Sequence, residues 1–207
     1  MKILTYAKGE LLTNTYFCID EASNQTIVID PGMRPDLIYE KIVEKHLEVK
    51  LILLTHGHFD HALGAKYLKE KTNAPVAVHI NDAELLSDSS KNSADIYFGG
   101  MCAYPEIIPD ITFSDGDTFD LGNETLKVIW SPGHTEGSSM FLSGENLFSG
   151  DTLFSDGFGR TDLYGGNENT LVDTINSLKK AGGVYKLYPG HGNSKREYDL
   201  SKIRYYW

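Results

Sequence analysis

Four side chains that can bind a metal ion lie within the six residues from His56 to His61. The sequence Thr-His-Gly-His-Phe-Asp-His at 55–61 supplies two imidazoles, then a carboxylate and a third imidazole. The apolar run at 51–54 predicts a buried strand before them, and the apolar spacing at 62–71 predicts a helix after them. A turn at the end of a buried strand is a rigid base for an open catalytic metal site. Four such groups in one turn favour a metal site over isolated core or solvated histidines.

Three further candidate ligands follow short apolar runs in the second half of the chain. They are His134 after the run 126–130, Asp151 after 146–149 and His191 after 184–188. Small or turn-forming residues flank each one, so the backbone can bend tightly there and present the side chain. If these strands end at the same edge of their sheets, we expect all seven ligands to converge on one place.

Five motifs resemble, in the same order, those of the metallo-β-lactamase-fold hydrolases, and specifically of the small glyoxalase II-like group (hydroxyacylglutathione hydrolase-like proteins). They are Thr55–His61, Pro132–Thr135, Gly150–Phe154, Gly159–Leu163 and Pro189–Gly192. The resemblance spans nearly the whole chain, and its metal motifs are more specific to the superfamily than to one substrate. It implies an α/β fold, a four-layer αββα sandwich with two sheets face to face and helices outside. It also implies a single domain over 1–207, without the helical carboxy-terminal domain that helps full-length glyoxalase II enzymes to hold glutathione.

The resemblance implies two metal sites joined by a shared carboxylate. His56, His58 and His134 would hold the first metal ion, and Asp60, His61 and His191 the second. Asp151 would bridge them. An aspartate there fits glyoxalase-type hydrolases, whereas β-lactamases of the family commonly place a cysteine at the comparable ligand. Imidazole and carboxylate ligands suit two divalent ions of zinc, iron or manganese, and we expect zinc.

The chemistry expected of such a centre follows from its charge. Two divalent ions bring about four positive charges, of which Asp60 and Asp151 offset about two. The remainder lowers the pKa of a bridging water toward neutrality, which generates hydroxide at physiological pH. This hydroxide would attack the carbonyl of a thioester of the S-lactoylglutathione type, whose thiolate leaves with little help from a general acid. Asp60 could also orient the nucleophile, so Asp60 and Asp151 are the predicted catalytic residues.

A second class of enzyme shares this fold. In a mononuclear non-haem iron persulfide dioxygenase, His56, His134 and Asp151 would form a two-histidine, one-carboxylate triad with open positions for oxygen. The presence of Asp60, His61 and His191 favours two metals over one. A non-catalytic binding protein is a third alternative, which an intact set of ligands disfavours.

Other residues near the motifs leave two interpretations open. Asp30, in Ile-Asp-Pro-Gly, could accept the second N–H of a metal-bound histidine, or the sequence could simply form a turn. Arg160 is expected to pair with Asp162 rather than to face an anionic substrate. The aromatic and glycine-rich segment 97–104 is either a lid over the metals or a loop packed on the core. The aromatic end at 205–207 is either a packing anchor or part of the pocket rim.

Composition limits the class of partner. The formal net charge of −10 argues against nucleic acid as the main partner. No segment has the length of a membrane span and the amino terminus lacks the apolar stretch of a signal peptide, so we expect a cytoplasmic protein without a membrane partner. Cys18 and Cys102 are expected to stay reduced, with Cys18 in the core and Cys102 in a loop. The expected partner is a small acyl-thiol substrate, and the sequence does not specify an oligomeric state.

The elements that must position the ligands alternate between strands and helices. Predicted strands cover 2–6, 15–20, 26–29, 51–54, 75–79, 118–120, 126–130, 140–142 and 146–148. Predicted helices cover 34–47, 62–71 and 169–180. The sequence Ser194–Glu197 matches a capping box and predicts a last short helix, whereas residues 87–117 have little periodicity.

Overall fold

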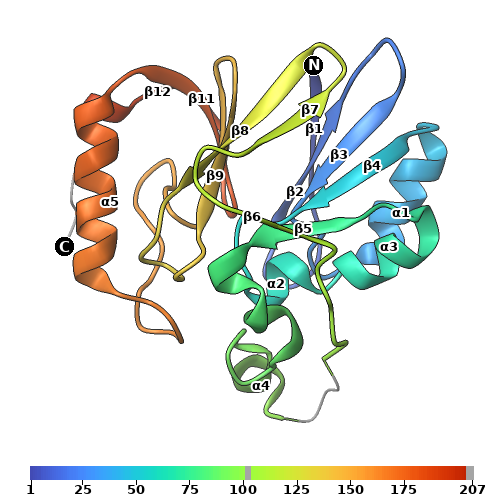
Figure 1. Cartoon of the computed structure of the whole chain (residues 1–207), viewed down its shortest axis with the longest axis horizontal. Coiled ribbons are helices and arrows are strands. Elements are labelled where there is room, and N and C mark those ends of the chain that lie inside the picture. Colours follow the sequence, from blue (N-terminus) through green and yellow to red (C-terminus); the bar gives the residue numbers. More distant parts are fainter. Residues whose placement is uncertain (101–103, 204–207) are drawn as a thin grey trace.

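The computed structural model describes residues 1–100 and 104–203, which form two six-stranded sheets packed face to face (Figure 1). The first sheet contains β1 (Lys2–Ala7), β2 (Asn14–Ile19), β3 (Gln25–Ile29), β4 (Glu48–Leu53), β5 (Val76–His79) and β6 (Ile111–Phe113). These strands neighbour one another in chain order. β1, β2 and β3 pair antiparallel, whereas β3 to β6 run parallel. The carboxyl ends of the parallel strands therefore lie at one edge of this sheet.

The second sheet also follows chain order. It contains β7 (Thr118–Leu121), β8 (Glu124–Trp130), β9 (Ser139–Ser143), β10 (Asn146–Gly150), β11 (Val184–Pro189) and β12 (Lys195–Asp199). All neighbouring pairs are antiparallel except β10 and β11, which are parallel. The connection between these two strands contains α5 (Glu168–Ala181), because parallel neighbours need a long crossover.

Helices cover the outer faces of both sheets. α1 (Pro35–Glu44) and α3 (Ala65–Thr72) pack on the first sheet, and α5 packs on the second (Figure 1). Two short helices, α2 (Phe59–Ala62) and α4 (Ala94–Phe98), lie together beyond one end of the first sheet (Figure 1). Three 3-10 turns, η1 (Ile80–Asp82), η2 (Glu84–Ser87) and η3 (Leu200–Lys202), complete the described elements.

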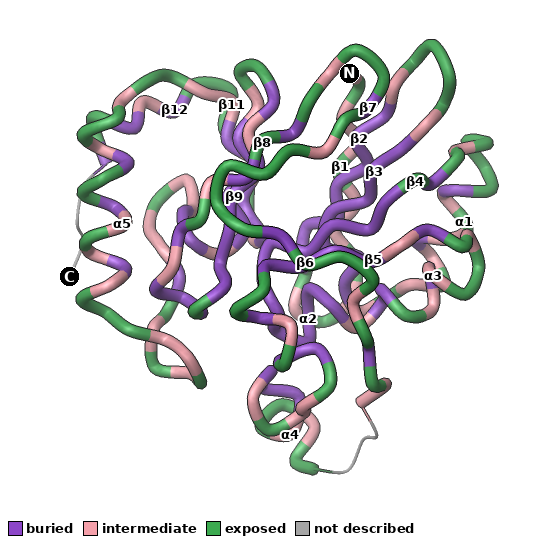
Figure 2. The backbone as a smooth tube through the Cα atoms, in the orientation of Figure 1, coloured by how far each residue is buried: buried purple, intermediate pink, exposed green. Residues whose placement is uncertain are grey.

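The alternation of side chains along each strand builds three apolar layers. In β2, Phe17 packs with the helices outside the sheet, whereas Tyr16 and Cys18 pack between the two sheets. Period-two alternation places neighbouring residues on opposite faces, so each inner strand can serve two layers. β2, β3, β5, β9 and β10 are accordingly buried along most of their length, while the outer sides of the helices are exposed (Figure 2). The expected αββα sandwich is confirmed, as is the core position of Cys18.

Several local expectations were wrong. The predicted helix at 194–197 is strand β12, because this segment pairs with β11 and buries Tyr198 against the core. The predicted helix at 62–71 is two helices, with α2 starting at Phe59. The aperiodic stretch 87–117 contains α4 and β6. The interpretations placed on Cys102 and on 205–207 lie outside the described residues. No helix among the described residues is both long and apolar enough to span a membrane.

Candidate metal centre

The ligands predicted at 56–61 follow β4 directly. His56 and His58 lie in the loop after the strand, whereas Asp60 and His61 lie on α2 rather than on the predicted turn. Gly57 separates the two loop histidines at a point where a Cβ would lie only 2.6 Å from Leu85 Cβ. The absence of a side chain at this residue lets the loop pack closely on η2.

The three distant ligands come from the second sheet. His134 follows β8, Asp151 follows β10 directly and His191 follows β11 after Pro189. The backbone at Gly133 has a φ of +132°, and a Cβ there would lie 2.4 Å from Leu171 Cα. Only glycine combines this φ with so close an approach to α5. The four strand ends meet at one edge of the sandwich, so the expected convergence of all seven side chains is observed.

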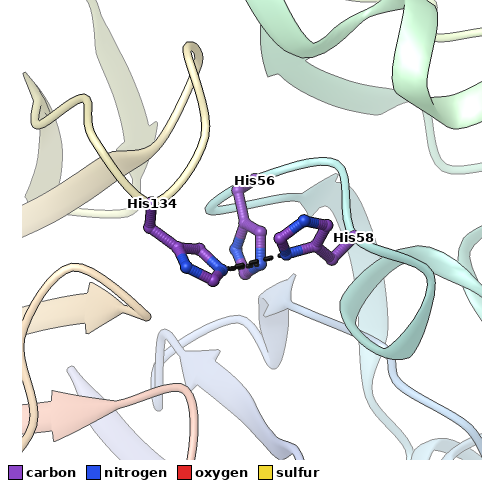
Figure 3. A group of neighbouring side chains, drawn as sticks. All are labelled: His56, His58 and His134. Atoms are coloured by element: carbon purple, nitrogen blue, oxygen red, sulfur yellow. Dashed lines mark hydrogen bonds between the residues drawn. The ribbon is translucent and has the colours of Figure 1, made fainter. Parts of the chain in front are cut away.

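Three histidines form the first group of potential ligands. His58 Nδ1 lies 2.9 Å from His134 Nε2, which lies 3.3 Å from His56 Nε2. Figure 3 shows the three rings pointing toward one another from two separate loops. All three side chains are at most 4% exposed. The expected first metal site is thus assembled as a compact, buried all-imidazole group.

Asp60, His61 and His191 form the second group. His191 Nε2 lies 3.2 Å from both His61 Nε2 and Asp60 Oδ2. Asp151 lies between the two groups, with Oδ1 3.4 Å from His61 Nε2 and Oδ2 3.7 Å from His134 Nε2. The carboxylate expected to bridge two metals therefore faces one histidine of each group.

Hydrogen bonds on the far side of the rings fix which nitrogen faces the centre with a lone pair. His134 Nδ1–H donates to the carbonyl of Arg160 at 2.7 Å, and His191 Nδ1–H donates to the carbonyl of Leu11 at 3.0 Å. Because a carbonyl only accepts, the Nε2 atom of each neutral ring carries the free lone pair. His61 Nδ1–H donates in the same way to Asp30 Oδ2 at 2.9 Å. The rings are therefore held in the tautomer that a metal ligand requires.

Two polar atoms of this centre are buried without a hydrogen-bond partner among the described residues. They are His58 Nε2 and Asp151 Oδ1. A buried carboxylate oxygen without a donor is costly unless a cation compensates it. Converging lone pairs and an unpartnered carboxylate oxygen fit a pair of divalent ions better than they fit a hydrogen-bonded core.

The pKa shifts separate the two groups electrostatically. Burial and the neighbouring imidazoles lower the pKa of His56, and they lower the pKa of His58 to about 3. Burial also opposes charge on His61, but the carboxylates of Asp151, Asp60 and Asp30 outweigh it and raise its pKa. Burial would raise the pKa of Asp151, yet the charge on His61 lowers it. His56 and His58 are thus neutral at pH 7, whereas the second group holds a proton that a metal ion can displace.

Asp30 supports the centre rather than simply forming a turn. Its Oδ1 accepts from the Thr55 backbone N–H at 2.8 Å, and its Oδ2 accepts from the Thr55 hydroxyl at 2.7 Å. Thr55 Oγ1 lies 3.1 Å from His56 Nδ1, so the ring N–H can donate to the hydroxyl oxygen. One buried carboxylate therefore orients His61 directly and His56 through Thr55.

Asp82 is a supporting residue that the motifs did not reveal. Its fully buried carboxylate, at the end of η1, accepts from Gly57 N at 2.8 Å, Thr135 Oγ1 at 2.7 Å and Gly137 N at 2.7 Å. Gly57 lies between the two loop histidines, and Thr135 follows His134. The available signal was an acidic residue just after β5, the parallel neighbour of β4, whose carboxyl end lies at the same edge.

Residues of β2 and the loop before it support the second group. Thr13 Oγ1 donates to Asp60 Oδ2 at 3.1 Å, and both side chains are buried. Asn14 Nδ2 donates to the carbonyls of Pro189 and Gly192 at 3.0 and 2.9 Å, on either side of His191. No spacing in the sequence links these residues to ligands that lie more than 40 positions away.

Two other expectations concern the surroundings of the metal ligands. The Arg160 guanidinium pairs with the Asp162 carboxylate through two contacts of 2.6 and 2.7 Å, as expected. Tyr97, from the segment considered as a lid, lines a cavity of about 360 Å³ over the ligands. The ring of Tyr97 also packs on Phe59, with ring centroids 5.1 Å apart. This residue therefore lies over the metal ligands, as a lid would, and also packs on the core.

Comparison with known proteins gives consistent relatives. A family model described as the metallo-β-lactamase superfamily matches residues 9–191. The probable metallo-hydrolase YqgX of Bacillus subtilis is 38% identical over 170 residues, which cover 81% of this chain and 78% of that protein. The crystal structure of the B3 metallo-β-lactamase BLEG-1 matches with a TM-score of 0.86 and 26% identity, over 97% and 95% of the two chains. The structure of TTHA1623 in a di-iron-bound form matches with a TM-score of 0.82 and 29% identity, over 96% and 95%.

Proposed function

Because the chain belongs to the metallo-β-lactamase superfamily, we propose that it is a binuclear metal-dependent hydrolase that cleaves thioesters. The observation that carries this proposal is the arrangement of the seven side chains in two groups with Asp151 between them. A centre for one metal would not need a second complete set of ligands. His56, His58 and His134 would hold the first ion, Asp60, His61 and His191 the second, and Asp151 would contact both.

Two bound divalent ions would supply a water of lowered pKa and positive charge next to the oxygen of the carbonyl under attack. The residues of the chain then have separate tasks. Without metal ions, burial would raise the pKa of Asp60, but the charge of His61 and the hydrogen bond from His191 lower it. Bound divalent ions would take over this role and keep the Asp60 carboxylate ionised, because a nearby positive charge favours the charged form. Asp60 Oδ2 can therefore accept a hydrogen bond from the attacking water and orient it. Asp30 and Asp82 keep the ligand loops in place throughout.

A thioester suits this centre because of what the centre lacks. The cavity over the ligands is lined by no lysine among the described residues, and its arginine is already paired with Asp162. A strong general acid for the leaving group is therefore not evident there. A thiol has a pKa of about 8.5, so its thiolate can depart without being protonated first, unlike an alkoxide or an amine anion. The acyl group of a thioester is thus transferred to water with the residues at hand.

A mononuclear iron dioxygenase acting on thiol persulfides is the second candidate. The di-iron-bound form of the structural neighbour TTHA1623 supports iron as the metal, although that protein holds two iron ions rather than one. If this chain were such a dioxygenase, His56, His134 and Asp151 would hold one iron ion. The second group, Asp60, His61 and His191, would then have a structural role. The two candidates predict different metal contents and different effects of removing His58.

Metal content is the first test. Protein purified without added metal should contain about two metal ions per chain by inductively coupled plasma mass spectrometry. The metal-loaded protein is then tested on thioesters, on a β-lactam and on a thiol persulfide, and oxygen uptake is recorded with the persulfide. We expect hydrolysis of the thioesters. One iron per chain together with oxygen uptake would replace the hydrolase with the dioxygenase. Hydrolysis of the β-lactam alone would retain the centre and overturn the thioester assignment.

Variants of the ligands separate the two candidates further. His58→Ala and Asp151→Ala should both abolish thioester hydrolysis and reduce the metal content. His46→Ala is a matched control, because His46 is exposed, belongs to neither ligand group and precedes β4, whereas the ligand loop follows that strand. Retained hydrolysis in both ligand variants would refute the binuclear mechanism. Full activity of His58→Ala with metal still bound would support the mononuclear triad.

A further inference from the structure

The cavity of about 360 Å³ over the metal ligands has a polar floor and apolar walls. Ligand side chains form its floor: His58, Asp60, His134, Asp151 and His191. Four aliphatic or aromatic residues from three separate segments, together with Phe59 of α2, form its walls: Leu11, Ile96, Tyr97 and Leu163. A substrate whose carbonyl reaches the floor must therefore place its neighbouring groups against apolar side chains.

The walls are available to a ligand rather than consumed by packing. The side chain of Ile96 is 71% exposed and that of Tyr97 is 37% exposed, although both are apolar or aromatic. The Tyr97 hydroxyl donates to Glu10 Oε2, which links α4 to the loop between β1 and β2. Tyr97 also lies against the buried ring of Phe59. This wall is thus anchored on two sides and leaves the aliphatic side chain of Ile96 free.

Apart from the metal centre, the described lining of the cavity offers a substrate carboxylate only one cationic side chain. Arg160 is the only lysine or arginine among the described residues that line it. One edge of its guanidinium contacts Asp162, with Nε to Oδ1 at 2.6 Å and Nη2 to Oδ2 at 2.7 Å, so this cation is already paired. This pairing lowers the pKa of Asp162 to about 2, so the carboxylate stays charged at any physiological pH. Glu10 adds a second negative charge behind Tyr97.

We propose that this cavity selects thioesters without a free carboxylate close to the reacting bond, with an apolar group lying against Ile96, Tyr97 and Leu163. The proposal rests on the hydrolase function proposed above and specifies its substrate class. A carboxylate held against these wall residues, away from the metal ions, would lose water without gaining an unpaired cationic side chain, which is unfavourable. An apolar group instead removes the exposed wall from water. A thiol that carries two carboxylates, such as glutathione, is consequently a poorer partner than an uncharged thiol.

A matched pair of substrates tests this selectivity. The 2-methylpropanoyl thioesters of N-acetylcysteamine and of glutathione share the acyl group and the bond that breaks. For the metal-loaded protein, kcat/KM should be higher by about tenfold or more for the N-acetylcysteamine thioester. Equal or better hydrolysis of the glutathione thioester would overturn the substrate class and leave the hydrolase function standing. Hydrolysis of neither by protein that contains two metals would overturn the hydrolase function itself.

Two isoleucines provide a matched test of the apolar wall. Ile96 is 71% exposed and lines the cavity, whereas Ile108 is 69% exposed and does not line it. Because both are exposed, neither truncation should destabilise the fold. Ile96→Ala should raise KM for the N-acetylcysteamine thioester by about fivefold to tenfold with little change in kcat. Ile108→Ala should leave both constants unchanged, and an identical response of the two variants would overturn the role of the wall.

Releasing Arg160 tests the charge argument in the opposite direction. Asp162→Asn removes the carboxylate that pairs with the Nε and Nη2 edge of the guanidinium. We expect this variant to lower KM for the glutathione thioester and to leave KM for the uncharged thioester unaltered. An equal change for both substrates would show that Arg160 and Asp162 only shape the loop, and would overturn their part in selectivity.

Discussion

Replacing Asp82 by asparagine should weaken the first metal site while leaving the second intact. The carboxylate accepts three buried hydrogen bonds, two at Oδ2 from Gly57 N and Thr135 Oγ1 and one at Oδ1 from Gly137 N. An asparagine can retain the two bonds at one oxygen, but its amide group then meets the Gly137 N–H donor to donor. One buried donor left without a partner costs about 1–3 kcal/mol. Alanine would leave all three unpartnered at about 3–9 kcal/mol, which approaches the total stability of a domain, so asparagine is the better variant.

The effect on metal binding follows from which loops Asp82 joins. Gly57 lies between His56 and His58, and Thr135 follows His134, so all three ligands of the first group depend on this carboxylate. Loss of a residue that supports metal ligands typically lowers metal affinity by about 10–100-fold. The second group is supported instead by Asp30 and by residues around β2, so its affinity should not change.

Competition with a chromogenic chelator, followed as two binding steps, would measure both affinities, and urea unfolding would measure stability. Asp88→Asn is the control, because the carboxylate of Asp88 makes only local contacts, with Ser90 and Lys91. An equal fall in both affinities would mean that Asp82 acts through general stability. An unchanged first affinity would mean that the ligand loops keep their positions without it. Either result would refute the reasoning.

Three other predictions concern the same edge of the sandwich. Thr13→Val removes the hydroxyl that donates to Asp60. We expect kcat/KM for thioester hydrolysis to fall about tenfold or more, because a hydrogen bond to a charged group contributes about 1.5–3 kcal/mol. An unchanged kcat/KM would show that Asp60 Oδ2 has no part in the mechanism. A Cβ at Gly190 would lie 2.1 Å from Asp151 Oδ1, whereas one at Gly157 would meet nothing within 4 Å. Gly190→Ala should therefore lose bound metal in mass spectrometry while Gly157→Ala keeps it, and equal metal contents would contradict the packing argument. At free metal concentrations a thousand times Kd, each ion should stabilise the fold by about 4 kcal/mol and raise Tm by about 8–16 °C. Calorimetry with and without a chelator checks this. The same Tm in both samples would show that metal binding does not stabilise the fold.

The seven side chains that converge in the structure could be found in the sequence because they share a local pattern. Each follows an apolar run and lies beside small residues, and such a pattern can be recognised without knowing the fold. Asp30 was recognisable for the same reason, since it directly follows β3. Asp82 carries no such pattern, because its partners belong to loops 25 to 55 positions away. The pairing of strands decides which residues lie next to a ligand and support it. A single sequence indicates that pairing only indirectly.

The error at 194–197 has a related physical cause. Ser194 and Glu197 match a capping box, and a local rule then favours a helix. In the structure, Tyr185 of β11 pairs with Tyr198 of β12, and Tyr198 packs in the layer under α5. The added strand extends the second sheet and buries an aromatic side chain, which a single helical turn in this position would leave outside. Tertiary pairing therefore overrode the local preference, as is common for short segments.

The hydrogen bonds that join the two sheets are concentrated where the metals would lie. Asp82, beyond the end of the first sheet, accepts from two residues of the loop between β8 and β9 in the second. Between β2 of the first sheet and β11 of the second, Asn14 and Tyr16 both donate to the carbonyl of Pro189 at the end of β11. Apolar layers alone would allow the sheets to slide by small amounts, because hydrophobic contacts have no direction. Two metal sites with ligands from both sheets do not tolerate such movement, so directional bonds at this edge fix the distance between the ligand loops before any metal binds.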